Sequence, residues 1–326
     1  MTRIAVLVTG GAGYIGSHCC KALYDSGYLP VCLDDLSTGH QEFVKWGPLV
    51  NASIADKNSV TKAISEFGIS AVVHLAASSL VGESVADPQK YYINNVTGTL
   101  ALLQAMLERN CKTIVFSSTG AVYGDAGGGA IREDAAGKPV SPYGVSKWMV
   151  ERILQDYGRA YGLKAVCLRY FNASGADASG LIGEWREQET HLIPRAMMAL
   201  QGQIPELQIF GVDYDTSDGT AVRDYIHVTD LAAAHIAALQ KLSTDFPGGS
   251  FNLGTGKGFS VRQVLSSIDK VTGKTVPTVI RARRDGDPTF IVADPSAARE
   301  VLQFRPAFSD LDTIIRSAWN WHQTRV

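Results

Sequence analysis

The chain begins with the apolar run Ile4-Ala5-Val6-Leu7-Val8, which is followed at once by Thr9-Gly10-Gly11-Ala12-Gly13-Tyr14-Ile15-Gly16. The apolar run predicts a buried parallel strand, and the residues after the glycines carry helical spacing. Gly10, Gly13 and Gly16 allow a tight turn and a close approach of a pyrophosphate, whose charge is stabilised at a helix N-terminus. This order of strand, glycine turn and helix predicts a dinucleotide-binding unit.

A second signal for a dinucleotide is Asp34, which closes the predicted strand Pro30–Leu33, 18 residues beyond Gly16. A carboxylate at this place accepts hydrogen bonds from a ribose 2′-hydroxyl and repels a 2′-phosphate. The alternative is that Asp34 and Asp35 are turn residues only. The glycine turn upstream favours the binding interpretation, and it predicts NAD rather than NADP.

The first half of the chain alternates short β-branched runs with longer amphipathic segments, which predicts an α/β fold with a doubly wound parallel (Rossmann) sheet. The predicted strands are Ile4–Val8, Pro30–Leu33, Ala71–Leu75, Thr113–Phe116 and Ala165–Leu168. The predicted helices are Ser17–Ser26, Asn58–Phe67, Tyr91–Arg109 and Tyr143–Tyr161.

The rhythm changes after about Asn172, where we expect helices and loops without regular strands. Ser250–Leu253 is the exception, because it predicts one more strand that returns to the main sheet. We therefore predict an NAD-binding domain over residues 1–173, with a return at about 220–255, and a smaller C-terminal substrate-binding lobe over 174–326. Glycine-rich stretches at Asp125–Gly129 and Gly254–Gly258 predict surface turns.

Tyr143 and Lys147 lie four residues apart, on one face of a predicted helix. A free tyrosine titrates near 10, and a neighbouring ammonium favours the phenolate, so the pair predicts a general base for a carbon that bears a hydroxyl. The strand before it ends in Ser117-Ser118-Thr119, which supplies hydroxyls for a substrate oxygen. The alternative is a packed tyrosine beside a solvated lysine, and the dinucleotide turn in the same chain argues against it.

The composition of the 326 residues is that of an ordinary globular enzyme, with 45% hydrophobic and 19% charged residues. A net charge of −2 offers no basic field for nucleic acid or an anionic membrane. The five cysteines show no metal-ligand spacing, so we expect buried free thiols, no metal and a reducing compartment. Without a signal peptide or a membrane span in the sequence, we expect a cytoplasmic protein.

Several motifs together resemble the extended short-chain dehydrogenase/reductase family and, within it, the UDP-glucose 4-epimerases. The resemblance covers almost the whole chain, and its later motifs are more specific than the glycine turn. The motifs are residues 10–16, 81–85, 94–99, 117–124, Tyr143 with Lys147, 169–172, 222–228 and 283–287.

The resemblance implies site residues, a cofactor and an assembly. The NAD contacts that it implies are Tyr14, Ile15, Asp34, Asp35, Leu36, Ile54, Leu75, Ala76, Ala77, Asn94, Tyr143, Lys147 and Phe171, beside the glycines Gly10, Gly13 and Gly16. The UDP-sugar contacts that it implies are Thr119, Tyr143, Asn172, Leu192, Phe210, Arg223, Arg284 and Asp287. Arg223 and Arg284 can clamp a diphosphate by bidentate hydrogen bonds, although an unplaced arginine is more often in a surface ion pair. The resemblance also implies a homodimer through the helices near Tyr91–Arg109 and Tyr143–Tyr161.

The sequence departs from the family pattern near the expected ligands. Ser53 stands where an aspartate is common, Ser79 where some members have lysine, and His191 where an asparagine lies near the diphosphate. Ile291 is intermediate in size at a position that affects the acceptance of N-acetyl sugars. Contact of Ser53 and His191 with ligand therefore stays open, and so does the range of sugars.

We expect Tyr143 to remove the proton from the sugar 4-hydroxyl while the C4 hydride passes to NAD, giving a 4-keto sugar that turns over before the hydride returns. This interconverts UDP-glucose and UDP-galactose. The alternatives are epimerisation of a UDP-pentose or UDP-N-acetylhexosamine, another sugar-nucleotide enzyme such as a dehydratase or decarboxylase, a net dehydrogenase, and a non-catalytic NAD sensor. Dehydratases carry an Asp-Glu pair after the active-site threonine, whereas this chain has Gly120-Ala121.

Overall fold

The computed structural model describes residues 3–124, 129–284 and 287–325. Most of the glycine-rich turn expected at Asp125–Gly129 therefore lies outside the described residues, as do two residues of the motif 283–287.

The centre of the described structure is a seven-stranded parallel sheet in the order β12-β7-β5-β4-β1-β2-β3. Its strands are β1 (Ala5–Thr9), β2 (Leu29–Asp34), β3 (Leu49–Asn51), β4 (Ala71–His74), β5 (Thr113–Thr119), β7 (Lys164–Tyr170) and β12 (Gly248–Leu253). The predicted doubly wound sheet is confirmed, and β12 confirms the predicted return of Ser250–Leu253. The short edge strand β3 was not predicted.

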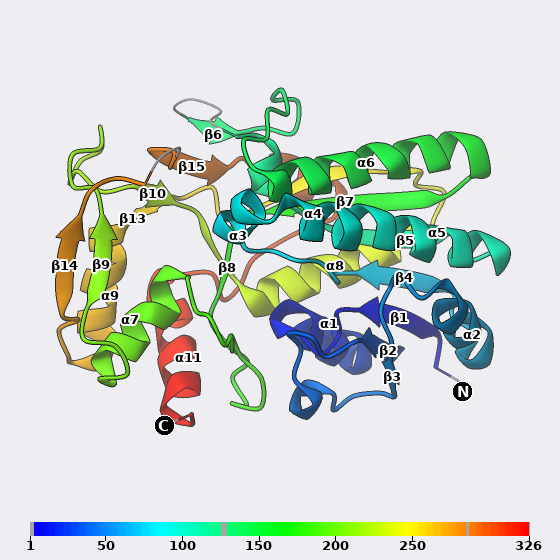
Figure 1. The fold of residues 1–326 in the computed structure, drawn as a ribbon, viewed down its shortest axis with the longest axis horizontal. Coiled ribbons are helices and arrows are strands. Elements are labelled where there is room, and N and C mark those ends of the chain that lie inside the picture. The colour runs from blue at the N-terminus through cyan, green and yellow to red at the C-terminus, as the bar shows by residue number, and fades with distance from the viewer. Residues whose placement is uncertain (1–2, 125–128, 285–286, 326) are drawn as a thin grey trace.

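Helices cover both faces of this sheet because successive side chains of a strand point to opposite sides. Val6 and Val8 of β1 pack in one hydrophobic core with α1 (Tyr14–Asp25) and α8 (Val228–Leu242). Ala5 and Leu7 pack in the core on the opposite face, which includes residues of three other helices. These helices are α2 (Lys57–Phe67), α5 (Gly98–Glu108) and α6 (Pro142–Tyr161). Figure 1 shows this arrangement of the sheet between two helical layers.

The helix expected over Tyr91–Arg109 is not one regular helix. It consists of the end of α4 (Pro88–Tyr91), a π-helical segment (Tyr92–Thr97) and α5, and α3 (Val81–Ala86) precedes it. Apolar spacing does not distinguish a π-turn from the α-helix that continues it, and π-turns of this kind are frequent at functional sites. Single 3₁₀ turns lie at Gln41–Phe43 and Gly120–Val122.

The expectation of a second half without regular strands, apart from β12, is wrong. Three small sheets pair β13-β10-β15-β6, β11-β8 and β14-β9 in the described residues. Their strands are β6 (Ala130–Ile131), β8 (Asn172–Ser174), β9 (Leu207–Phe210), β10 (Val222–Arg223), β11 (Tyr225–His227), β13 (Phe259–Ser260), β14 (Thr278–Arg281) and β15 (Phe290–Ala293). Two to four residues are too few for the period-2 pattern that identifies a strand in sequence.

The C-terminal helices surround a core of their own, which contains Ile193, Ile268 and Ile314. The helices of this core are α7 (Leu192–Leu200), α9 (Val261–Thr272) and α11 (Leu311–Gln323). The short helix α10 (Ser296–Val301) packs instead, through Ala298, in the core that also holds α1 and α8. Figure 1 shows α7, α9 and α11 with β9 and β14 on one side of the central sheet. The border between two domains at residue 173 stays a prediction.

The five cysteines are free and buried, as the sequence predicted. Among the described residues, no helix combines the length and the apolar character needed to cross a bilayer.

Candidate active site

The glycine turn after β1 gives each of its three glycines a separate structural role. Gly10 has φ +70°, and a Cβ there would lie 2.7 Å from the backbone nitrogen of Ala76. A Cβ on Gly16 would overlap the carbonyl oxygen of Gly10, so α1 can pack on the turn only without a side chain at this place. Gly13 is the N-cap of α1 and is open except for the Gly10 oxygen, 3.3 Å from a Cβ. The helix N-terminus has no side-chain cap and no acidic residue in its first turn, so its N–H groups fit a pyrophosphate.

Asp34 ends β2 beside this turn, and its side chain is buried. The backbone N–H of Ala12 donates to its Oδ2 over 3.0 Å, and the N–H of Leu36 donates to its Oδ1 over 2.9 Å. Burial raises the pKa of Asp34, and these two N–H groups oppose that shift. Leu36 has φ +59°, a left-handed conformation that is strained for leucine and that directs its N–H toward the carboxylate. The geometry fits recognition of a ribose.

The other residues expected at the cofactor lie on neighbouring elements. Leu75, Ala76 and Ala77 follow β4, where the N–H groups of Leu75 and Ala76 donate to the Thr9 carbonyl and hydroxyl oxygens. Ile54 is buried against Gly98. Asn94 lies in the π-helical segment, and Phe171 packs on Gly120, next to Thr119. Their contact with a cofactor stays a prediction.

The catalytic residues expected from the sequence come together at the end of β5. Tyr143 lies in the first turn of α6, and Lys147, one turn later, donates from Nζ to the Ser117 carbonyl oxygen over 2.8 Å. The same amine lies 4.8 Å from the ring centroid of Phe116. Thr119 is the last residue of β5, and its hydroxyl accepts from the Ala121 N–H.

The structure does not support the expectation that the Lys147 ammonium lowers the pKa of Tyr143. Burial raises the pKa of Tyr143, and a hydrogen bond with Thr119 and the charge of Arg186 only partly oppose it. Burial also lowers the pKa of Lys147 to about 7, with Glu151 opposing. Desolvation of both groups therefore outweighs the attraction that sequence spacing suggested.

A buried chain of hydrogen bonds that the sequence analysis did not identify links the cofactor turn to α6. His74 Nδ1 lies 2.7 Å from the Thr9 hydroxyl, and its Nε2 lies 2.9 Å from the Thr99 hydroxyl. Thr99 donates to the carbonyl oxygen of Asn95, whose amide donates to Ser146 over 3.0 Å. This chain fixes the π-helical segment against the helix that carries Lys147. The only signal in the sequence was a histidine at the end of a predicted strand.

The residues expected at the diphosphate form a cluster in the C-terminal half. Arg223 and Asp287 form an ion pair with 2.5 Å between Nη2 and Oδ1. The Arg284 guanidinium lies 3.9 Å from the ring centroid of Phe210. The two pairs are connected by the Asp287 N–H, which donates to the Arg284 carbonyl oxygen over 3.2 Å, and the Tyr214 hydroxyl donates to Asp287 over 3.4 Å.

The last two residues that the sequence predicts at the substrate lie on other elements. Asn172 begins β8, which pairs with β11, and its N–H donates to the Asp224 carbonyl oxygen over 3.2 Å. Arg223, next to Asp224, is therefore close to Asn172 in space. Leu192 begins α7 and packs against the core around Ile193.

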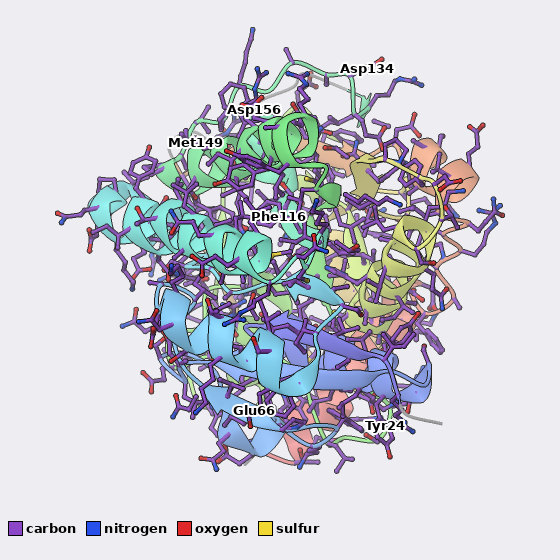
Figure 2. The ribbon with its side chains drawn as sticks, turned by 90° about the vertical axis from the view of Figure 1, so that its right-hand side faces the viewer. Tyr24, Glu66, Phe116, Asp134, Met149 and Asp156 are labelled. Atoms are coloured by element: carbon purple, nitrogen blue, oxygen red, sulfur yellow. The ribbon has the colours of Figure 1, made fainter. Side chains whose placement is uncertain are left out.

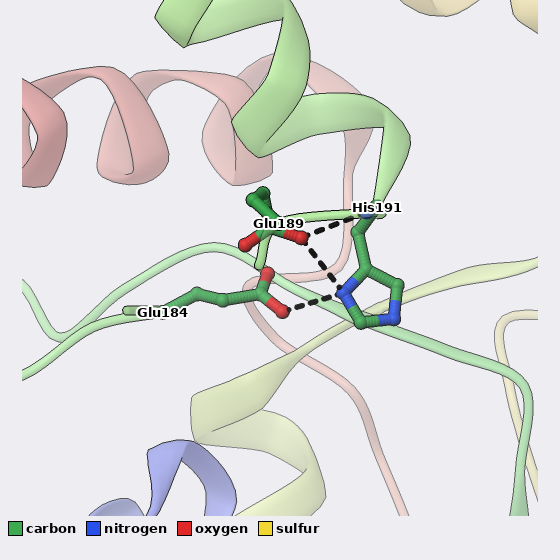
Figure 3. A group of neighbouring side chains, drawn as sticks. All are labelled: Glu184, Glu189 and His191. Carbon is green, nitrogen blue, oxygen red and sulfur yellow. Dashed lines mark hydrogen bonds and ion pairs between the residues drawn. The ribbon is translucent and has the colours of Figure 1, made fainter. Parts of the chain in front are cut away.

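Glu184, Glu189 and His191 form a further cluster, which Figure 3 shows. His191 Nδ1 lies 2.9 Å from Glu184 Oε1 and 3.2 Å from Glu189 Oε1, and Arg186 Nε lies 3.1 Å from Glu184 Oε1. One possible ligand atom each of Glu184, Glu189 and His191 lies within 4.8 Å of the other two, a spacing that a metal ion could bridge. The guanidinium and a protonated imidazole already balance the two carboxylates, so the arrangement is that of an ion network.

The protonation of His191 predicts a pH-dependent stability. Burial lowers the pKa of His191, but Glu184 and Glu189 outweigh burial and raise it to about 9. Its contribution is fully present below pH of about 6.5 and is lost as the pH rises through about 9. We expect a loss of about 1 kcal/mol over this interval, because the side chain is partly exposed. Denaturant unfolding at pH 6 and pH 9.5 measures this loss of stability. If His191→Gln lost as much stability between the two pH values as the wild type, His191 would not be the group responsible.

The chain is similar in sequence and in fold to known proteins. A model of the NAD dependent epimerase/dehydratase family matches residues 6–254. A UDP-glucose 4-epimerase of Rhizobium meliloti (strain 1021) is 48% identical over 320 residues, which cover 98% of this chain and 97% of that protein. The crystal structure of a Brucella ovis UDP-glucose 4-epimerase in complex with NAD is 51% identical, with a TM-score of 0.95 and 97% of each chain covered. A Stenotrophomonas maltophila UDP-glucose-4-epimerase with bound NAD and formylated UDP-arabinopyranose is 40% identical, with a TM-score of 0.96 and 99% of each chain covered.

Proposed function

The chain belongs to the NAD dependent epimerase/dehydratase family, and on that premise we propose that it is an NAD-dependent 4-epimerase that interconverts UDP-glucose and UDP-galactose through a 4-keto sugar. The observation that carries this proposal is the meeting of three features at the carboxyl ends of adjacent strands. The glycine turn follows β1, Ala76 follows β4, and Thr119 ends β5, with Lys147 bonded to the same strand. Ligands of such sheets bind at this edge.

Gly10, Gly13, Gly16 and Asp34 would hold the pyrophosphate and a ribose of NAD. The chemistry that NAD supplies when bound is a positively charged ring, which favours the phenolate and reversibly accepts a hydride from the sugar C4. Tyr143 removes and returns the proton of the 4-hydroxyl, and Thr119 hydrogen-bonds the same sugar oxygen. Lys147, which is held by its hydrogen bond to the Ser117 carbonyl oxygen, would position Tyr143 and the nicotinamide ribose.

The remaining predicted contacts complete the site that we propose. Toward the cofactor these are Tyr14, Ile15, Asp35, Leu36, Ile54, Leu75, Ala76, Ala77, Asn94 and Phe171. Toward the substrate, Arg223, Arg284, Phe210 and Asp287 hold the diphosphate and uridine, with Leu192 and Asn172. A firm hold on the diphosphate allows the hexose to turn over without leaving the site.

A dehydratase is the weaker candidate because the first residue of its acidic pair has no room here. A Cβ on Gly120 would lie 2.7 Å from the ring of Phe171, so a longer acidic side chain cannot occupy this position in the same packing. Epimerisation of UDP-pentoses or UDP-N-acetylhexosamines uses the same residues and is decided by substrate comparison.

The purified protein is expected to convert UDP-galactose to UDP-glucose without added NAD, because the cofactor is regenerated in each cycle. Chromatography of the nucleotide sugars measures the product, and UDP-N-acetylgalactosamine and UDP-xylose in parallel reactions measure substrate range. Absence of UDP-glucose even with NAD supplied would contradict the proposal.

The surface beside α6 supports a homodimer. Exposed apolar side chains gather on α3, the π-helical segment and α6, namely Val81, Val85, Ile93, Trp148 and Met149. Figure 2 shows Met149 on α6, which runs beside α5. Clustered exposed apolar groups are typical of an interface between proteins. We propose that two copies pair through this face, and sedimentation equilibrium measures the mass directly.

The free buried cysteines also support action in a reducing compartment, the cytoplasm.

A further inference from the structure

An aromatic stack joins two segments through residues, His40 and Trp185, that the proposed chemistry does not use. The first is the loop after β2, residues 35–44, here called the ribose loop. The second is the segment 183–191 before α7, here called the strap. The rings of His40 and Trp185 are parallel within 4°, with 3.8 Å between centroids, and His40 Nε2 lies 3.1 Å from the Trp185 carbonyl oxygen. The Arg325 guanidinium covers the Trp185 ring at 4.0 Å.

The inner side of the ribose loop is attached to the dinucleotide turn. The His40 N–H donates to the Ala12 carbonyl oxygen over 2.9 Å, and a Cβ on Gly39 would lie 2.7 Å from Asp34 Oδ1. The loop therefore cannot move away without disturbing the turn and the carboxylate. Ser37 and Thr38 at its tip are exposed, so the outer side of the loop is held by the aromatic contacts of His40.

The strap is itself held in place by contacts with α11 and α7. The Trp321 indole N–H donates to the Glu184 carbonyl oxygen over 2.8 Å, and Gly183 packs directly on the Trp321 ring. Phe43 of the ribose loop is buried in the same cluster, 5.8 Å from Trp321 between ring centroids. The ion network of Glu184 with His191 anchors the other end of the strap to α7.

We propose that Trp185 and His40 form a latch that holds the ribose loop closed over bound NAD and slows its release. The inference rests on the proposed function, in which the hydride returns from the same cofactor molecule that received it. If the reduced cofactor left before the hydride returned, a keto sugar would remain. The cofactor must therefore stay bound for longer than one turnover. Trp185 and His40 are positioning residues that act through Asp34 and the glycine turn.

The test measures NAD release from the purified holoenzyme, with an NAD-hydrolysing enzyme in excess to destroy what leaves. Trp185→Ala is expected to release NAD about tenfold faster than the wild type, the effect expected for a lost ring stack with a cation over it. Trp185→Phe keeps a stacking ring and is expected to stay near the wild-type rate. The control is Tyr24→Ala, which removes a surface ring that Arg3 covers at the same 4.0 Å, away from the ribose loop.

His40→Ala gives an independent variant on the other side of the stack, and it is expected to release NAD as fast as Trp185→Ala. Activity of both variants is expected to fall on dilution and to return when NAD is added in excess. Wild-type release rates in both variants would overturn the latch, and so would equal acceleration in Tyr24→Ala. A wild-type protein that binds no NAD would instead overturn the proposed function, and the latch with it.

Discussion

Tyr143→Phe is expected to lower kcat by about 10³-fold, because we propose that its phenol oxygen exchanges a proton with the sugar hydroxyl. The variant keeps the ring, which packs edge-to-face on Tyr91 with 6.4 Å between centroids, so the fold should be retained. Initial rates with UDP-galactose measure the loss, and far-UV circular dichroism with NAD content checks the fold and the cofactor.

The matched control for this substitution is Tyr161→Phe, at the exposed end of the same helix. It removes one hydroxyl from α6 and is expected to leave kcat unchanged. A Tyr143→Phe enzyme that keeps more than a tenth of the wild-type kcat would show that another group carries the proton.

Gly16→Ala is expected to abolish NAD retention and to destabilise the fold by about 1–3 kcal/mol or more, the usual cost of overpacking. The added methyl would overlap the Gly10 carbonyl oxygen and approach the backbone of Gly11, and neither can turn aside as a flexible side chain could. The turn or α1 must therefore shift. Absorbance of the purified protein at 260 and 280 nm measures bound NAD, and thermal unfolding measures stability.

Two further glycine variants separate binding from folding. Gly82→Ala lies in α3, where a Cβ meets nothing within 4 Å, so both measurements should match the wild type. Gly13→Ala meets only the Gly10 oxygen at 3.3 Å, so it should fold and yet bind NAD more weakly, because its open face is where the pyrophosphate approaches. Full NAD retention in Gly16→Ala and Gly13→Ala would refute this site for the cofactor.

The cofactor turn was predictable because its evidence is local. Gly10, Gly13 and Gly16 are required by backbone geometry within one turn, and Asp34 follows at the distance that one helix and one strand impose. The central strands were predictable for the same reason, since buried parallel strands are short continuous apolar runs. Tyr143 and Lys147 followed from the repeat of a single helix.

Other features depend on which distant segments meet, and the sequence did not reveal them. In the part of the chain that the structure describes, the eight short strands outside the main sheet are held by partners from elsewhere in the chain, such as β8 by β11. Glu184 and His191 become an ion network only because the strap folds back on α7. Trp185 meets His40 across 145 positions of sequence.

The sequence by itself determined the doubly wound fold, the glycine turn and the placement of Tyr143 and Lys147 on one helix, because backbone sterics and residue periodicity act over a few neighbouring positions. Only the tertiary structure shows the effect of burial on these two side chains, which raises the pKa of Tyr143 and lowers that of Lys147. It also brought together the buried hydrogen bonds of His74 and the stacked rings of His40 and Trp185. Desolvation and long-range contact depend on how the whole chain packs, and no local pattern records them.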